Sequence, residues 1–276
     1  MEESSQNINK NRVLAGIGEL FVRSWDIFKR RAVTLIFLYI MSIIFFSLAF
    51  GIFFGTGHLF SVIFPGSRKA IIAGGGLIGC IAGFIAMLWG LAAFICAVSD
   101  ETLEIKNALE SGSQRIGSFI WLFIILGFIV TGGFLLIIIP GIIFAVWFIF
   151  SQFILAREKE KGMNALLKSK EYVKGYWFDV FIRLSLIWFI SVIIGMIPVL
   201  GAILSIFFVP YMMIFVYLIY DDLKTVKGEI TFLSSRGEKL KWIGAGILGY
   251  IILPFFLIGL MGVYLSTYLS SLLFFY

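Results

Sequence analysis

Four long stretches of the chain contain no charged residue, and this feature limits the possible folds more than any other. They cover residues 70–98, 116–156, 184–220 and 243–276. About 20 apolar residues suffice to cross the roughly 30 Å hydrocarbon core of a bilayer. Each stretch is therefore long enough for one membrane span, and the second and third are long enough for two. The sequence predicts an all-α, polytopic integral membrane protein.

The composition agrees with this fold class. Hydrophobic residues make up 61% of the 276 residues, whereas soluble domains contain about 45–50%. Between the apolar stretches, no polar segment reaches the roughly 50 residues that an independent domain needs. We therefore expect one integral membrane unit and exclude a soluble enzyme domain.

Two breaks in the apolar stretches indicate tight hairpin turns. Proline interrupts helical hydrogen bonding and glycine accepts turn dihedrals, so Pro140 with Gly141, and Pro198 with Gly201, are predicted to divide one stretch each. Pro254 leaves two alternatives for the last stretch, a single kinked span or a re-entrant hairpin. The predicted spans are 32–54, 71–98, 117–139, 142–156, 180–197, 202–220 and 243–265.

Basic residues predict how the spans are oriented. Twenty of the 22 Lys and Arg residues fall on one side of the predicted spans, and only Arg68 and Lys69 fall on the other. Cytoplasmic loops of membrane proteins carry the excess of Lys and Arg. The N-terminus is therefore predicted to lie in the cytoplasm, and the positive net charge of +6 is explained without a nucleic-acid partner.

Amphipathic segments precede three outward-going spans and share a common plan. Segment 19–29 matches segment 164–174, and segment 107–116 is a weaker copy. Apolar residues at helical spacing opposite Lys and Arg are typical of helices that lie in the membrane interface. We expect a polar tail at 1–13, a six-span domain of three elbow–span–span units at 14–224, and a cytoplasmic linker with a last span at 225–276.

The elbow segments have two interpretations. Either they anchor the fold at the headgroup level, or their basic side chains gather anionic lipid headgroups, each contributing on the order of 1 kcal/mol. Within these segments we expect ion pairs between Glu19 and Arg23 and between Asp26 and Arg30. A further pair, Asp179 with Arg183, is expected at the start of the fifth span. The candidate headgroup residues are Arg23, Lys29, Lys168, Lys170, Lys174 and Arg183.

The residue types that usually carry catalysis are scarce. His58 is the single histidine, and the two cysteines, Cys80 and Cys96, are too far apart on a helix for a disulfide. Asp221 and Asp222 are interpreted as boundary charges at the end of the sixth span. We find no nucleophile with a base and no ionisable residue deep in a span. The sequence therefore predicts no catalytic residue, no metal site and no cofactor.

Three glycines at four-residue spacing, Gly75, Gly79 and Gly83, line one face of the second span. Small residues at this spacing allow two helices to approach closely. The partner is either another helix of the same chain or a second copy in a homo-oligomer.

Several short motifs resemble a known family. They are the segment 135–142 with its Pro-Gly pair, then 153–158, Ala165-Leu166, Ser169, Lys174-Gly175 and 220–223. With these motifs the chain resembles the glycerophosphoryl diester phosphodiesterase membrane-domain family and related six-span bacterial proteins, over residues 14–224. The resemblance implies a bacterial inner-membrane protein with a membrane-accessory role. In fused members the phosphodiesterase activity belongs to a separate soluble barrel, which this chain lacks.

The leading hypothesis is a non-enzymatic protein that binds or redistributes membrane lipids, including anionic ones. A second hypothesis is a scaffold or assembly subunit that docks a membrane-protein partner. A third is a channel or carrier for a neutral solute. The absence of charges deep in the spans argues against a proton-driven pump.

Overall fold

The computed structural model describes residues 14–136, 138–231 and 234–273, and these residues form helices joined by short turns and loops without a β-strand. In this described part of the chain, seven helical segments are long and apolar enough to cross a membrane. The predicted class, an all-α bundle with six spans and a seventh, is therefore confirmed.

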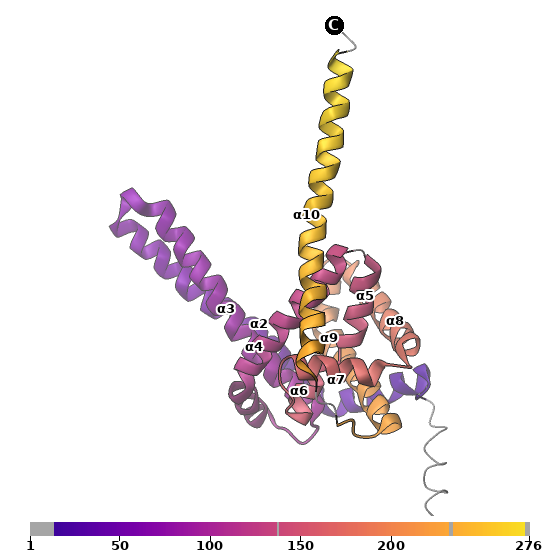
Figure 1. Ribbon diagram of the computed structural model, residues 1–276. Helices are drawn as coiled ribbons and strands as arrows, with labels where there is room; N and C mark the ends of the chain where they lie inside the picture. Colours follow the sequence, from indigo (N-terminus) through magenta and orange to yellow (C-terminus); the bar gives the residue numbers. More distant parts are fainter. Residues whose placement is uncertain (1–13, 137, 232–233, 274–276) are drawn as a thin grey trace, which may run out of the picture.

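The first two long helices form a hairpin that projects from the rest of the molecule (Figure 1). Helix α2 (Ile17–Ile63) and helix α3 (Arg68–Ser99) are joined by the short 3-10 helix η1 (Pro65–Ser67). At 1.5 Å per residue, α2 is about 70 Å long, more than twice the thickness of the hydrocarbon core.

The glycine stripe of α3 faces α2. A Cβ on Gly75 would lie 2.9 Å from the carbonyl oxygen of Phe53, and one on Gly83 would lie 2.9 Å from the ring of Phe46. Gly79 likewise faces Phe50 and Phe53 of α2. Of the two partners considered for this stripe, the structure places the helix of the same chain against it.

The middle of the chain forms a compact body (Figure 1). Helix α4 (Ile105–Leu136) is followed by α5 (Ile138–Phe148) and α6 (Ser151–Glu158), and then by the short α7 (Met163–Val173). Helices α8 (Trp177–Gly195) and α9 (Leu200–Lys227) form a second hairpin. α5 and α6 together make up the predicted fourth span.

The two predicted hairpin turns differ in detail. Pro140 and Gly141 lie inside the first turn of α5, so the chain reverses before them and not at them. Proline is tolerated there because the first turn of a helix has no internal partner for its N–H. Pro198 does lie in the turn between α8 and α9, while Gly201 is in the first turn of α9, where it passes the carbonyl oxygen of Ile194.

The last apolar stretch is a single helix, α10 (Arg236–Leu273), with Pro254 inside it. This decides between the two alternatives in favour of one span. Its first turns pack on α4, where Gly132 meets the backbone of Gly246 and Gly249. Beyond these contacts the helix leaves the body (Figure 1), and its described side chains from Phe255 to Ser266 are exposed.

Only one of the three elbow segments forms a separate helix. Segment 164–174 becomes α7, because it lies between the loop 159–162 and Gly175, whose φ is +87°. Segments 19–29 and 107–116 are continuous with the spans that follow them, inside α2 and α4. No Gly or Pro lies between segment 19–29 and its span, and the single Gly117 after segment 107–116 is accommodated inside α4, so helical hydrogen bonding continues through both junctions.

The best-packed part of the core lies at the predicted cytoplasmic end of the bundle. Buried side chains concentrate in 92–98 of α3, 153–156 of α6, 165–169 of α7 and 214–220 of α9. The distal half of the α2–α3 hairpin and most of α10 are instead covered with exposed apolar side chains. The fold thus packs the polar ends of the helices closely together. The distal α2–α3 hairpin and most of α10 lie outside this packed region.

Candidate functional site

A cavity of 690 Å³ lies among the predicted cytoplasmic ends of α2, α3, α4, α6 and α9. We call it the basic cavity, because four cationic residues line it together with three acidic ones. Apolar side chains of α2, α3 and α9, among them Ile27, Cys96 and Leu218, form part of its wall. The charged lining residues are Arg23, Arg115, Arg157, Lys159, Asp100, Glu101 and Asp221.

The loop between α3 and α4 holds Asp100 through local hydrogen bonds. The backbone N–H and the hydroxyl of Thr102 both donate to its Oδ1, at 2.9 Å and 2.6 Å. These bonds keep the pKa of the Asp100 carboxyl below its usual value. Arg31 donates to the backbone carbonyls of Asp100 and Leu103, at 3.1 Å and 2.6 Å, which ties the same loop to α2.

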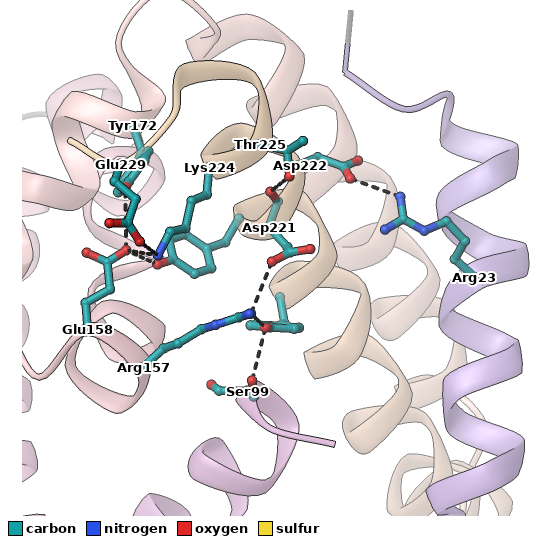
Figure 2. Close-up of polar contacts among 12 residues, drawn as sticks. Arg23, Ser99, Arg157, Glu158, Tyr172, Asp221, Asp222, Lys224, Thr225 and Glu229 are labelled. Atoms are coloured by element: carbon teal, nitrogen blue, oxygen red, sulfur yellow. Dashed lines mark hydrogen bonds and ion pairs between the residues drawn. The ribbon is translucent and has the colours of Figure 1, made fainter. Parts of the chain in front are cut away.

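The other two acidic residues of the cavity have basic partners. Arg30 pairs with Glu101 at 3.4 Å, and Arg157 pairs with Asp221 at 3.1 Å. Arg157 also donates to the hydroxyl of Tyr217, whose own O–H donates to the Ser99 carbonyl at 3.0 Å. Figure 2 shows Arg157 in the middle of this chain of contacts from α3 to α9. Two of the three negative charges of the cavity thus have a basic partner within the protein, and the third, on Asp100, accepts hydrogen bonds from Thr102.

Two cations of the cavity are not compensated in this way. Arg115 of α4 donates to the backbone carbonyl of Ala156, a neutral acceptor. Lys159 follows the end of α6 with a φ of +61°. Within the residues that the structure describes, neither of these two side chains forms an ion pair with a carboxylate. The basic cavity therefore contains positive charge that is available to an anionic ligand.

Next to the cavity, Glu158 is the centre of a second polar group, which we call the Glu158 cluster. Its carboxylate lies 2.5 Å from Nζ of Lys168 on α7 and 3.0 Å from Nζ of Lys224 on α9. The hydroxyls of Tyr220 and Tyr172 donate to it at 2.5 Å and 3.3 Å. Figure 2 shows Tyr172 of α7 and Lys224 of α9 beside this carboxylate.

The Glu158 cluster is nearly closed to solvent. The Glu158 and Lys168 side chains are 10% and 11% exposed. Burial and the negative charge of Glu158 raise the pKa of Tyr172 to about 12, so this phenol stays protonated at neutral pH. A carboxylate that is buried with two ammonium groups and two hydroxyl donors has its hydrogen-bonding capacity filled. The cluster therefore locks α6, α7 and α9 together and leaves no room on the carboxylate for a ligand.

The candidate headgroup residues lie in different places. Arg23 lines the basic cavity and pairs with Asp222 at 2.9 Å. Lys168 is buried in the Glu158 cluster. Lys170 lies over the rings of Trp147 and Trp242, at 5.7 Å and 5.2 Å from their centres.

The remaining candidates are also engaged within the chain. Lys29 pairs with Asp26 at 3.1 Å and Lys174 with Glu171 at 3.6 Å, both on exposed surface. Arg183 is buried and donates to the Ala15 carbonyl at 3.0 Å. The structure does not bring these six residues together into one site.

Of the predicted ion pairs, two are present and one is wrong. Glu19–Arg23 and Asp179–Arg183 are found at 4.0 Å and 3.6 Å. Asp26 pairs with Lys29 and not with Arg30, because Arg30 reaches across to Glu101 of the α3–α4 loop. Asp221 and Asp222 lie within the last two turns of α9, and each has an arginine partner from another helix.

Sequence reasoning missed the residues that define the cavity, namely Arg115, Arg157, Lys159 and the neighbouring Glu158. A signal was present in the pattern: basic and acidic residues recur at the predicted cytoplasmic end of four spans, so they must meet when the spans bundle. Chain spacing alone does not say which of them pair. Comparison with protein-family models, with curated proteins and with solved structures gave no match.

Proposed function

We propose that this chain is a non-enzymatic integral membrane protein that binds or redistributes membrane lipids. The observation that carries the proposal is the basic cavity. Its cations lie beside apolar side chains at the end of the bundle where the headgroup layer is predicted. A phospholipid has the same arrangement, with an anionic group beside an apolar tail. Arginine and lysine are the residues that bind phosphate oxygens best.

The charge balance of the cavity supports this reading. Its three carboxylates have donors within the protein, while Arg115 and Lys159 keep their charge for a ligand. A cytoplasmic leaflet rich in anionic lipid attracts such cations, with about 1 kcal/mol for each Lys or Arg near the surface.

A second candidate, a scaffold subunit, is favoured by a different observation. The exposed part of α10 and the distal α2–α3 hairpin offer long apolar surfaces that pack against nothing else in the described structure. Lipid tails would cover them, and so would the helices of a partner membrane protein or of a second copy.

Native mass spectrometry of the protein released gently from its membrane separates the two candidates. We expect monomers that retain phospholipid molecules. A stoichiometric protein partner without retained lipid would favour the scaffold and contradict the lipid proposal.

Redistribution has its own test. In proteoliposomes with fluorescent lipid in both leaflets, a membrane-impermeant quencher removes only the outer-leaflet signal unless lipids change leaflet. We expect protein-dependent loss of the protected inner signal, relative to vesicles with an unrelated multi-pass protein. If the inner-leaflet signal is protected as fully as in the control vesicles, the protein does not move lipids between leaflets, and only the proposal of lipid binding is left.

A further inference from the structure

The two uncompensated cations of the basic cavity indicate which chemical group it takes. We propose that Arg115 and Lys159 form a phosphate-binding site, which holds the phosphate of a phospholipid headgroup or a free phosphate. This inference deepens the proposed function and rests on it, since it specifies the group bound in the same cavity.

The two residues approach the cavity from different elements, α4 and the end of α6. Arg115 is fixed by its bond to the Ala156 carbonyl, which comes from the last turn of α6. That bond uses one N–H of a guanidinium that has five. The remaining donors of Arg115 and the ammonium of Lys159 are thus carried on one rigid junction between α4 and α6.

A phosphate fits this pair better than a carboxylate does. It offers oxygens in several directions, so it can accept from a guanidinium and from a separate ammonium at the same time. The third cation of this side, Arg157, is held by Asp221 and Tyr217. Arg157 therefore adds positive electrostatic potential at the site while it remains bonded to Asp221 and Tyr217.

The cavity also contains its own reporter. Cys96 lines it, whereas the other cysteine, Cys80, is exposed on the α2–α3 hairpin. In a Cys80→Ala protein, the rate at which a small thiol reagent modifies Cys96 measures how open the cavity is. A ligand in the cavity slows this rate, while lipid bound around the outside of the bundle does not.

The test compares three conditions for the full chain in nanodiscs. They are digalactosyldiacylglycerol alone (a neutral lipid without phosphate), the same lipid with phosphatidylglycerol, and the same lipid with added inorganic phosphate. We expect Cys96 modification to slow several-fold with phosphatidylglycerol. Slowing by inorganic phosphate as well identifies a site for free phosphate, and slowing by the lipid alone identifies a headgroup site.

Lys159→Gln is the decisive variant: the Lys159 side chain forms no ion pair with the described residues, so we expect its replacement to leave the fold intact. We expect it to abolish most of the protection of Cys96. Lys161→Gln is the matched control: it removes the same charge from the same loop, but Lys161 does not line the cavity. Arg115→Gln should act like Lys159→Gln, with an added loss of stability from the bond to Ala156.

Equal Cys96 rates in all three conditions would overturn the phosphate site, and so would protection that survives in Lys159→Gln. Mass spectrometry of the same samples distinguishes this failure from failure of the proposed function. Lipid that stays bound to the Lys159→Gln protein while the phosphate site fails would leave lipid binding standing. A wild-type protein that retains no lipid would contradict both.

Discussion

At the scale of single residues, the structure separates charges that hold the fold from charges that are free to bind. Glu158 and Lys168 illustrate the first kind, since both side chains are buried and form an ion pair with each other. Lys159 illustrates the second, since it lies in the same region of the chain but faces the cavity. Reversing the charge of Lys168 would therefore disturb packing before it disturbed any contact with lipid.

Glu158→Gln should destabilise the protein strongly. Removing the negative charge leaves the buried Lys168 without an acidic partner and Lys224 with only Glu229, at 3.4 Å. Breaking a buried ion pair from one side costs about 3 kcal/mol or more. The free energy of unfolding, measured by detergent titration, should fall accordingly.

The neighbouring Glu160→Gln is the control, because Glu160 forms no ion pair in the described part of the chain. If the two variants were equally stable, the Glu158 cluster would not be a structural lock.

Tyr172 predicts a pH dependence at the alkaline end. Its pKa rises from 10.0 in the free side chain to about 12 in the folded protein, through burial and the charge of Glu158. The folded state therefore holds this proton more tightly than the unfolded state does. The stability that Tyr172 contributes is complete below pH 10 and is lost as the pH rises towards 12.

Unfolding midpoints across this range should fall less steeply in Tyr172→Phe than in the wild type. If the unfolding midpoint fell equally steeply with pH in the two proteins, the raised pKa of Tyr172 in the folded state would be contradicted.

At the scale of helices, the ends of an element can be predicted wherever the apolar pattern stops at a Gly or Pro residue. The apolar stretches and the Pro198 turn predict helices that the structure contains, and Gly162 with Gly175 bounds α7. The elbow at 19–29 differs because its amphipathic pattern continues into an apolar one without a breaker, so one helix of 47 residues forms. Amphipathicity alone does not specify a bend.

Close packing of α3 against α2 should depend on Gly75 and not on the adjacent Gly74. A Cβ on Gly75 would meet backbone atoms of α2 at 2.9 Å and 3.0 Å, whereas a Cβ on Gly74 meets nothing within 4 Å. Backbone atoms do not rotate away, so Gly75→Ala should destabilise the hairpin by about 1–3 kcal/mol. Gly74→Ala should be neutral or stabilising by up to about 1 kcal/mol, since alanine favours helix.

The same detergent titration measures both glycine variants. A Gly74→Ala protein less stable than Gly75→Ala would contradict the placement of the stripe against α2.

At the scale of the whole molecule, the chain combines a rigid junction at one end with two long apolar elements. Helices α2 and α10 are about 70 Å and 57 Å long, so in a core of roughly 30 Å they must tilt or extend beyond it. The number of spans was predictable because it depends on local composition. The basic cavity was not, because it is formed by residues from five helices whose arrangement depends on long-range packing.

Orientation remains a prediction of the charge distribution. In a protein without native cysteines, Ser67→Cys should react with an impermeant maleimide added to intact cells, and Lys161→Cys should react only after the membrane is opened. The reverse pattern would place the basic cavity on the outer side and contradict the positive-inside assignment.

Lipid binding is tested most directly by cross-linking the protein in its membrane with a phospholipid that carries a photoreactive group beside its phosphate, and by mapping the modified residues. Lipid binding at the basic cavity predicts cross-links to the α3–α4 loop and to the end of α6, reduced in Lys159→Gln and unchanged in Lys161→Gln. Cross-links confined to the outer surfaces of α10 and the α2–α3 hairpin would contradict it.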